Sequence, residues 1–256
     1  MSSVNIARLT DRGVVRVDGA DGEKLLQSLV TNEIEGLDAG EACFAGLLSP
    51  QGKILFDFFI VRTETGYLLD VAAAKTADLV KRLTMYKLRA DVAIADVSPS
   101  FAVYAVWGNG AAALTATRSC VHFNDPRHPA MGIRWLVQSP PPPDAQVVEL
   151  AHLDYDALRV RLGVPESAKD FEFGDAYPHE ADFDLFRGVS FTKGCYVGQE
   201  IVARMQNKMV VRKRVVKISA AAPLTSGAEI RLGEIAIGRI GTVDGMRGLA
   251  MVRLDR

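Results

Sequence analysis

The sequence predicts an α+β protein in two parts, a body of residues 1–209 and a small C-terminal β-barrel of residues 210–256. In the first half, apolar runs of strand length alternate with stretches whose apolar residues recur at helical spacing, a mixture typical of helices packed on sheets. After residue 210 the pattern changes to short strands divided by glycine-containing turns, which favours a barrel. A chain of 256 residues, 48% of them hydrophobic, is long enough to bury both cores.

The first half predicts one ferredoxin-like unit, because its elements follow roughly the order β-α-β-β-α-β. A hairpin lies at its centre, since two apolar runs flank Ser49-Pro50-Gln51-Gly52, in which Pro before Gly indicates a tight turn. The expected elements are strands at 14–17, 43–48, 53–61, 67–71 and 92–97, a helix that Asp21 caps, and a helix at 75–86.

From Phe101 the pattern partly repeats, so we expect a second ferredoxin-like half. Four prolines at 140–143 are interpreted as a surface loop, although a stiff polyproline II connector fits them too. The expected elements of this half are strands at 101–107, around 121 and at 133–137, and helices near 111–117 and at 145–162. The expected barrel strands are 211–218, 229–232, 235–243 and 249–254.

Composition excludes several classes of protein. Lys and Arg total 30 against 31 Asp and Glu, so the net charge is -1 and we expect no stable nucleic-acid binding. Three cysteines without a CxxC pair argue against a disulfide framework, and four scattered histidines predict no mononuclear metal site. The N-terminal residues lack the apolar core of a signal peptide, and no apolar stretch approaches the about 18 residues of a membrane span. We therefore expect a cytoplasmic protein that does not enter membranes.

Cys195 is the strongest candidate for chemistry. It lies just before a helix predicted at 197–207. Near a helix N-terminus and beside Lys193, a thiol is shifted towards its thiolate, the form that attacks, binds metal or senses redox state. Gly194 and Gly198 allow the backbone to approach a neighbour closely. The alternative is an inert buried cysteine, because free cysteines are among the most buried residues.

A basic run leads into the predicted barrel. It could receive an acidic partner, a polyglutamyl folate tail or RNA phosphate, but alternating charge on an exposed strand is the commoner arrangement. The interleaved aromatic residues of an RNA-reading motif do not accompany it. The run consists of Lys208, Arg212, Lys213, Arg214 and Lys217.

Residues 193–200, Lys-Gly-Cys-Tyr-Val-Gly-Gln-Glu, resemble the K-G-C-Y/F-x-G-Q-E signature of the YgfZ family of folate-binding proteins. The resemblance extends over nearly the whole chain and is weak only in the linking segments and the C-terminal strands. The other matching segments are residues 17–21, 49–53, 125–127, 158–166, 178–184, 188–191 and 201–204.

This resemblance implies the fold of an aminomethyltransferase, the T-protein of glycine cleavage, in which the two ferredoxin-like halves form a folate-binding body. It implies tetrahydrofolate, or a folate derivative, as the cofactor. It also implies an accessory role in the assembly or repair of 4Fe–4S clusters in a subset of enzymes, including radical enzymes that thiolate tRNA, with Cys195 as the functional thiol. The partners would be folate and iron–sulfur enzymes or assembly proteins.

The resemblance also selects residues for the folate site. Asp57 lies on the strand where aminomethyltransferases place acidic residues, and an exposed strand aspartate is the alternative. Arg161 stands where an aminomethyltransferase is expected to carry a glutamate that grips the pterin, so we expect it to pair with the folate tail or with Glu180. A plain arginine on the helix surface is the alternative. Arg127 is expected to anchor a loop or to touch the ligand. The remaining candidates are Lys193, Gln199 and Glu200.

Two other functions fit parts of the sequence. A true tetrahydrofolate-dependent aminomethyl or one-carbon transferase is supported by the fold and Asp57. Arg161, which stands in place of the expected glutamate, argues against the transferase. Cys195 also argues against it, because such a transfer does not require a reactive cysteine. A non-catalytic module that holds RNA or a protein partner through the basic run is the third hypothesis. Whether the protein is an enzyme stays open, and an assembly factor is favoured.

Overall fold

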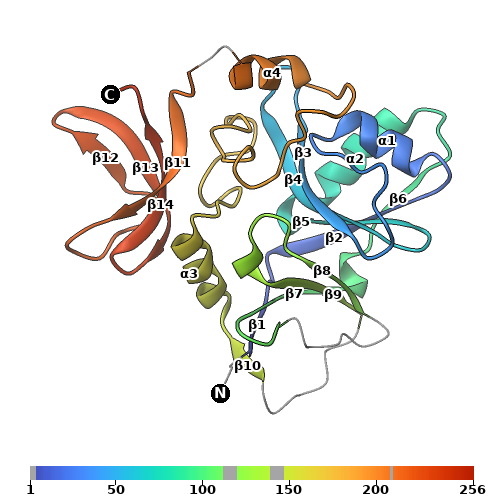
Figure 1. Cartoon of the computed structure of the whole chain (residues 1–256), viewed down its shortest axis with the longest axis horizontal. Coiled ribbons are helices and arrows are strands. Elements are labelled where there is room, and N and C mark those ends of the chain that lie inside the picture. Colours follow the sequence, from blue (N-terminus) through green and yellow to red (C-terminus); the bar gives the residue numbers. More distant parts are fainter. Residues whose placement is uncertain (1–3, 112–119, 139–146, 208–209) are drawn as a thin grey trace.

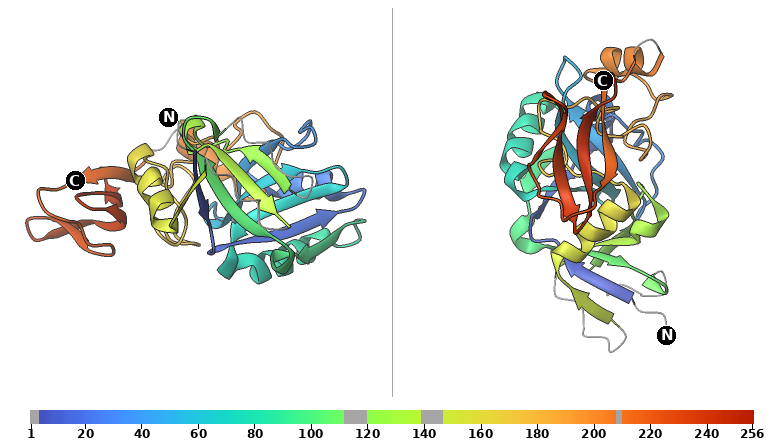
Figure 2. Two further views of the ribbon diagram at one scale, coloured as in Figure 1. Left: turned by 90° about the horizontal axis from the view of Figure 1, so that it is seen from below. Right: turned by 90° about the vertical axis from the view of Figure 1, so that its left-hand side faces the viewer.

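The structure is a computed structural model that describes residues 4–111, 120–138, 147–207 and 210–256 (Figure 1). Within these ranges the strands form three sheets, two of five strands in the body and one of four at the C-terminal end. The four-stranded sheet stands at one end of the molecule (Figure 2). None of the helices in these ranges combines the length and apolar character that a membrane crossing requires.

The first half builds a five-stranded antiparallel sheet that two helices cover on one face (Figure 1). Its elements are β2 (Arg12–Asp18), α1 (Gly22–Leu29), β3 (Ala42–Leu48), β4 (Ile54–Arg62), β5 (Gly66–Ala72), α2 (Thr76–Lys87) and β6 (Ala93–Asp96). The strand order is β3-β4-β5-β2-β6. The leucines of α1 and α2 pack against Phe56, Phe58 and Ile60 of β4. The predicted hairpin and helices are confirmed, with one strand more than the simple ferredoxin-like order.

The start of α1 differs from the prediction, because Asp21 does not cap the helix. Its carboxylate instead accepts a hydrogen bond from the backbone N–H of Asp91 at 2.8 Å. The loop before β6 crosses the start of α1, and this long-range contact takes the oxygen that a cap would use.

A second five-stranded sheet has the order β10-β1-β7-β9-β8. Its strands are β1 (Val4–Arg8), β7 (Ala102–Trp107), β8 (Cys120–Asn124), β9 (Ile133–Val137) and β10 (Val147–Leu150), and α3 (His152–Leu162) follows. β1 was not predicted; it pairs antiparallel with β7 and parallel with β10. Three short 3₁₀ helices, Ala73–Lys75, Ser98–Ser100 and Pro129–Met131, lie in connections of the body.

The predicted helix at 145–162 is wrong over its first residues, because β10 occupies positions 147–150. Pairing with β1 gives this segment the hydrogen-bond partners of a strand, and such partners override a local helical pattern. The helix predicted near 111–117 and the four prolines lie almost wholly outside the described residues.

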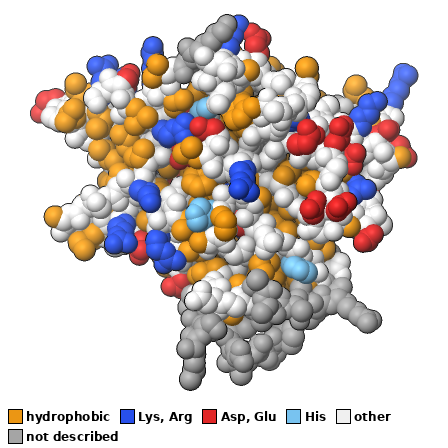
Figure 3. Space-filling view, viewed as in Figure 1, with side chains coloured by type: hydrophobic (Ala, Val, Ile, Leu, Met, Phe, Trp, Pro, Cys, Tyr) orange, Lys and Arg blue, Asp and Glu red, His pale blue; other side chains and the backbone are white. Residues whose placement is uncertain are grey.

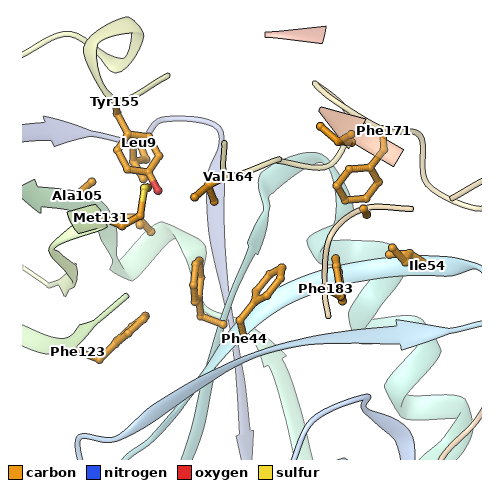
Figure 4. Packing of buried hydrophobic residues seen from close by; sticks show 14 of the residues in the cluster. Leu9, Phe44, Ile54, Ala105, Phe123, Met131, Tyr155, Val164, Phe171 and Phe183 are labelled. Atoms are coloured by element: carbon orange, nitrogen blue, oxygen red, sulfur yellow. The ribbon is translucent and has the colours of Figure 1, made fainter. Parts of the chain in front are cut away.

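The two five-stranded sheets and α3 enclose a hydrophobic core, part of which Figure 4 shows. Phe44 enters it from β3 and Phe123 from β8, and Tyr155 enters from α3. The ring centre of Phe44 lies 4.8 Å from that of Phe183 and 5.5 Å from that of Phe59. Because each fully buried phenylalanine contributes about 1.5–3 kcal/mol, this core binds the two halves of the body together.

The C-terminal sheet consists of β11 (Lys213–Ser219), β12 (Glu229–Leu232), β13 (Ile235–Asp244) and β14 (Arg247–Arg253) in the order β11-β14-β13-β12. All neighbours are antiparallel. The four predicted strands of this region are confirmed to within a few residues. The preceding helix of the body, α4 (Gln199–Asn207), leads towards β11.

Ion pairs join the C-terminal sheet to the body. Arg214 of β11 donates to Asp182 at 2.9 Å and to the two oxygens of Asp184 at 2.9 and 3.1 Å. Its neighbour Lys213 donates to Asp175 at 2.8 Å. Two side chains of the predicted basic run, Arg214 and Lys213, therefore form ion pairs with carboxylates of the body.

Other members of the basic run lie outside this junction or pack on the body. Lys208 is outside the described residues. The methylene groups of Lys217 cover Gly163, where an added Cβ would come within 3.3 Å of Lys217 Cδ. Among the described residues on the face in Figure 3, Lys and Arg side chains are scattered and form no continuous patch. These positions favour the structural interpretation of the run over a nucleic-acid surface.

Asp182 should make stability depend on pH. Burial raises the pKa of this carboxyl to about 7, against the opposing effect of Arg214. Between about pH 4 and pH 7 the folded protein keeps a proton that the unfolded chain releases, so the contribution of Asp182 to stability falls as pH rises through this window. Asn at this position does not titrate, so Asp182→Asn should not show this loss. The free energy of unfolding of the variant minus that of the wild type should therefore increase by up to about 4 kcal/mol between pH 4 and pH 7. Urea unfolding at several pH values measures this difference, and a difference independent of pH would contradict it.

Candidate functional site

Charged and polar side chains gather at the centre of the body, where both five-stranded sheets and α3 meet. Their side chains are almost fully buried. Because an unpaired charge in such a place is costly, ion pairs and hydrogen bonds connect most of them. We call this group the central polar cluster; it consists of Arg12, Asp57, Asp70, Asp125, Arg127, Arg134, Tyr155, Arg159, Glu166, Ser167 and Asp170.

Three guanidinium groups of the cluster surround the ring of Phe59. The guanidinium carbons of Arg127, Arg134 and Arg12 lie 4.6, 4.7 and 6.0 Å from the ring centre. Arg12 and Arg134 also share the carboxylate of Asp70, at 2.6 and 3.3 Å. The shared carboxylate offsets the repulsion between the cations, and each contact with the aromatic face adds about 0.5–2 kcal/mol.

Arg127 anchors the loop before β9. Its Nε and Nη2 donate to the two oxygens of Asp125 at 3.0 and 2.7 Å, and its backbone N–H donates to the same carboxylate at 3.0 Å. Nη2 also donates to the hydroxyl of Tyr155 at 2.9 Å, which Arg134 reaches at 2.8 Å. Of the two roles expected for Arg127, these contacts correspond to the loop anchor.

Arg159 connects the cluster to the C-terminal sheet. Its side chain is fully buried and pairs with Asp156, Glu166 and Asp170 at 2.7, 2.9 and 2.8 Å. It also donates to Oγ1 of Thr242 on β13 at 3.0 Å. Burial alone would raise the pKa of Glu166, but Arg159 and nearby cations hold it well below its usual range.

Asp57 on β4 differs from the other carboxylates of the cluster. It is 4% exposed and accepts a hydrogen bond from the hydroxyl of Ser167. Burial raises the pKa of its carboxyl, against the opposing effect of Arg12. Within the described part of the chain no cation lies at ion-pair distance from Asp57, whereas Asp70 and Glu166 are paired. A ligand with N–H donors, such as a pterin ring, could bond the carboxylate oxygen that Ser167 does not use, so the residues fit that group.

The interpretation of Asp57 as an exposed strand residue is therefore wrong. Its position on β4 explains this, because the register places Asp57 opposite Gly46 of β3 inside the sheet. The segment that carries Ser167 lies against the carboxylate.

Arg161 does not pair with Glu180 and lies on the surface of α3, as the alternative for it predicts. It is exposed, whereas Arg159 is fully buried, because residues two apart on a helix point in nearly opposite directions. Glu180 accepts a hydrogen bond from the backbone N–H of Tyr177 at 2.9 Å and lies 3.6 Å from Lys213, so its pairing with Arg161 is wrong. Burial raises the pKa of Glu180.

Cys195 is the accessible thiol of the three cysteines. It is exposed, while Cys43 is buried and Cys120 is half-buried, and all three are free. Burial raises the pKa of Cys43 to about 12 and that of Cys120 to about 11, so neither forms much of the reactive thiolate near neutral pH. The interpretation of Cys195 as an inert buried cysteine is wrong.

Lys193 does not activate Cys195 in the way expected. Its ammonium group donates to the backbone oxygens of Gln27, Val30 and Asn32 at 2.9, 2.9 and 2.6 Å, around the C-terminal end of α1. Burial lowers the pKa of the ammonium to about 8. These bonds occupy its three N–H groups, which leaves none for the thiol or for a folate.

The helix after Cys195 begins at Gln199, two residues later than predicted. Gly198 has a φ of +83° and closes the loop against the β3–β4 turn, where an added Cβ would lie 2.6 Å from the oxygen of Ser49. The close approach expected at Gly198 is confirmed. At Gly194 an added Cβ would meet nothing within 4 Å, so the same expectation is wrong there. Cys195 lies outside the first turn of α4, where the helix dipole acts most strongly.

The other two residues of the signature are at the start of α4. Gln199 is half-buried. Glu200 is exposed and pairs with Arg204 one turn later. A surface pair of this kind contributes only about 0–1 kcal/mol to stability.

The predicted residues other than Arg161 and Glu180 thus divide between two places. Asp57 and Arg127 lie together in the central polar cluster, and Cys195 lies on a surface loop beside the β3–β4 turn. Among the described residues, no three or more His, Cys, Asp or Glu side chains are grouped so that they could hold a metal ion.

Sequence reasoning missed most of the central polar cluster. A signal was present, because charged residues interrupt apolar strand runs at Asp70 in Tyr-Leu-Leu-Asp-Val and at Arg134 in Ile-Arg-Trp-Leu-Val. Such residues are rarely buried without a partner. Their partners lie far away in the sequence, as in the pairing of Arg12 with Glu166 at 3.5 Å. The local pattern of apolar and polar residues therefore could not show which charges would pair.

Two five-stranded sheets around a polar centre, followed by a C-terminal sheet, define a protein with the aminomethyltransferase fold. The structure resembles glycine cleavage system aminomethyltransferase T from Bartonella henselae with a TM-score of 0.82, over 99% of this chain and 79% of that one, at 15% sequence identity. Residues 1–136 match the family described as GCVT N-terminal domain, and residues 212–256 match the CAF17 C-terminal beta-barrel domain. The predicted fold class is confirmed.

Similar sequences identify the branch of this family. The human protein named iron-sulfur cluster assembly factor IBA57, mitochondrial, is 33% identical in an alignment that covers 96% of this chain and 76% of that protein. A homologue of the same name from Mycosarcoma maydis is 35% identical over 238 residues, which cover 85% of this chain and 58% of that protein. The chain therefore belongs to the IBA57 family of GCVT-domain proteins. It spans little more than half the length of the fungal relative.

Removal of Arg159 should destabilise the protein strongly. In Arg159→Met the carboxylates of Glu166 and Asp170 stay buried without their main partner, so the free energy of unfolding should fall by about 3–5 kcal/mol. The matched control is Arg204→Met, which removes an exposed pair and should change stability by less than about 0.5 kcal/mol. Equal urea midpoints for the two variants would contradict the central role of Arg159.

Proposed function

We propose that this protein is an accessory factor in iron–sulfur cluster assembly. The single observation that carries the proposal is the exposed thiol of Cys195 within the Lys-Gly-Cys-Tyr-Val-Gly-Gln-Glu segment of an IBA57-family chain. The relatives from human and Mycosarcoma maydis are named iron-sulfur cluster assembly factors. A thiolate is a soft ligand and suits iron–sulfur clusters.

In this proposal Cys195 acts at the surface, where a partner protein can reach it. The thiol either binds iron or a cluster transiently or exchanges with a disulfide of a partner, in which case its thiolate attacks one sulfur and the other leaves as a thiolate. The clients are 4Fe–4S enzymes, among them radical enzymes that thiolate tRNA, as the resemblance to the YgfZ family implies. The relatives are named mitochondrial proteins. For this chain we propose a reducing compartment such as the cytoplasm, because its three cysteines are free thiols.

We further propose that the body binds a tetrahydrofolate derivative at the central polar cluster. The support is the buried carboxylate of Asp57, which has a hydroxyl partner and no cation at ion-pair distance among the described residues. Asp57 would accept hydrogen bonds from N–H groups of the pterin, a pairing that specifies a flat polar ring in a buried site. Ser167 would hold the carboxylate in place.

A second candidate function is an aminomethyl or one-carbon transferase. The raised pKa of Asp57 favours it, because a carboxyl poised closer to neutrality can move a proton at a folate nitrogen. Sustained formation of methylenetetrahydrofolate from an aminomethyl donor would support this function. Against it stands Cys195, whose exposed thiol has no part in such a transfer.

Cys195→Ala should abolish the cellular role and leave the fold intact, because an exposed residue contributes little to packing. In cells that lack this protein, the activity of a 4Fe–4S tRNA-thiolating enzyme should be restored by the intact chain and by Cys120→Ala, and not by Cys195→Ala. Cys120 is the matched control, since it is a second free cysteine that is only partly accessible. Full restoration by Cys195→Ala would refute the functional thiol.

Asp57→Asn should weaken folate binding by about 10–100-fold, because a hydrogen bond to a charged partner is worth about 1.5–3 kcal/mol. Titration calorimetry with 5-formyltetrahydrofolate measures the affinity of both proteins. Asp78→Asn, an exposed aspartate on α2, is the matched control and should bind as the wild type does. An unchanged affinity in Asp57→Asn would remove Asp57 from the folate site.

A further inference from the structure

The segment that leads to Cys195 is bonded along one edge to the end of α1. The hydroxyl of Thr31 donates to the oxygen of Gly188 at 2.6 Å, and the backbone N–H of Ser190 donates to the oxygen of Thr31 at 2.9 Å. The amide of Asn32 donates to the oxygen of Arg187 at 2.6 Å. Residues 187–198, which we call the Cys195 loop, are therefore fixed along their first part.

Lys193 completes this attachment two residues before the thiol. The last carbonyl groups of a helix have no partners within it, and a cation placed there is favoured by the helix dipole. The last turn of α1 contains no basic residue of its own. Lys193 supplies the cation from a position more than 160 residues later and bonds the oxygens of Gln27, Val30 and Asn32.

The other end of the Cys195 loop is held by a close backbone contact. Gly198 packs against the β3–β4 turn, with its hypothetical Cβ 2.6 Å from Ser49 O and 3.1 Å from the Cα of Gly52. Gly52 in turn lies under Ile201 of α4, where an added Cβ would approach to 2.8 Å. Both glycines have positive φ, so larger residues would be strained at either position.

Between these two attachments Gly194 and Cys195 form the accessible part of the loop, and Tyr196 after them is buried in the core. Gly194 has open space around it and Cys195 is exposed. The loop thus combines a short accessible segment with two fixed ends. A thiol that must meet a cluster or a partner's thiol in one geometry gains from such pre-organisation, since small displacements of a reacting group are costly.

We infer that Lys193 is a positioning residue that sets the place of the Cys195 thiol by fastening the loop to the C-terminal end of α1. This inference rests on the proposed function of Cys195 for its biological meaning, but the mechanical link between the two residues is independent of that function. Lys193 acts through the backbone of the loop and touches neither a ligand nor the reacting sulfur.

A spin label on Cys195 tests the mechanical link directly. In a Cys120→Ser background, where the remaining Cys43 is buried, a methanethiosulfonate nitroxide attaches to Cys195. Lys193→Met keeps the length of the stem and removes the three donors, so the electron paramagnetic resonance spectrum should change from restricted to mobile. Amide hydrogen exchange at residues 188–194 should accelerate by about tenfold, the effect of losing one such hydrogen bond.

Lys87→Met is the matched control. Lys87 also sits at the end of a helix, α2, and its amine donates to a backbone oxygen, that of Val92, at 2.7 Å. Its loss should lower the melting temperature without changing the Cys195 spectrum. If Lys193→Met does not fold, Lys193→Gln, which is shorter and keeps one amide donor group, should give intermediate mobility. A Cys195 spectrum that is unchanged in a folded Lys193 variant would overturn the inference.

The cellular assay separates this inference from the proposed function. Lys193→Met should lose most of the rescue of the 4Fe–4S enzyme, whereas Lys87→Met should retain it. If Cys195→Ala still rescues the enzyme, the proposed function fails whatever the spectra show. If Cys195→Ala fails to rescue while Lys193→Met is mobile and fully active, the place of the thiol does not matter and Lys193 is not a positioning residue.

Discussion

The buried ion pairs of Arg159 are the constraint on which the rest of the structure depends. A fully buried guanidinium requires carboxylates around it, and Glu166 and Asp170 supply them from the segment after α3. Asp170 also accepts a hydrogen bond from the backbone N–H of Thr242 at 2.8 Å, so the same group of charges reaches the C-terminal sheet. The two parts of the chain therefore share one electrostatic centre, in addition to the surface pairs of Arg214.

The β3–β4 hairpin connects the two candidate sites. Its strand β4 carries Asp57 into the central polar cluster, and its turn supports Gly198 at the end of the Cys195 loop. A ligand that orders the cluster would bear on the same hairpin that holds the loop. The two candidate sites therefore share one two-stranded element of the fold.

The similarity to an aminomethyltransferase describes the fold of this chain and not its function. The aminomethyltransferase shares the fold at 15% identity, and a fold by itself does not carry a reaction. The candidate sites of this chain contain a buried carboxylate at Asp57, an arginine at position 161 that faces solvent, and an exposed thiol at Cys195. These features fit an assembly factor that uses the body to bind a ligand and the surface loop to meet partners.

The sequence by itself determined the elements whose signals are local. Alternating apolar residues, the Pro-Gly turn and the glycine-rich signature placed the hairpin, the helices of the first half, the C-terminal strands and Cys195. Only the tertiary structure decided that β1 joins the second sheet and that Lys193 bonds α1 and not the thiol. It also decided that Arg159, and not Arg161, enters the core. The reason is that strand pairing and buried ion pairs join residues far apart in the chain, and no local pattern records which partner each will meet.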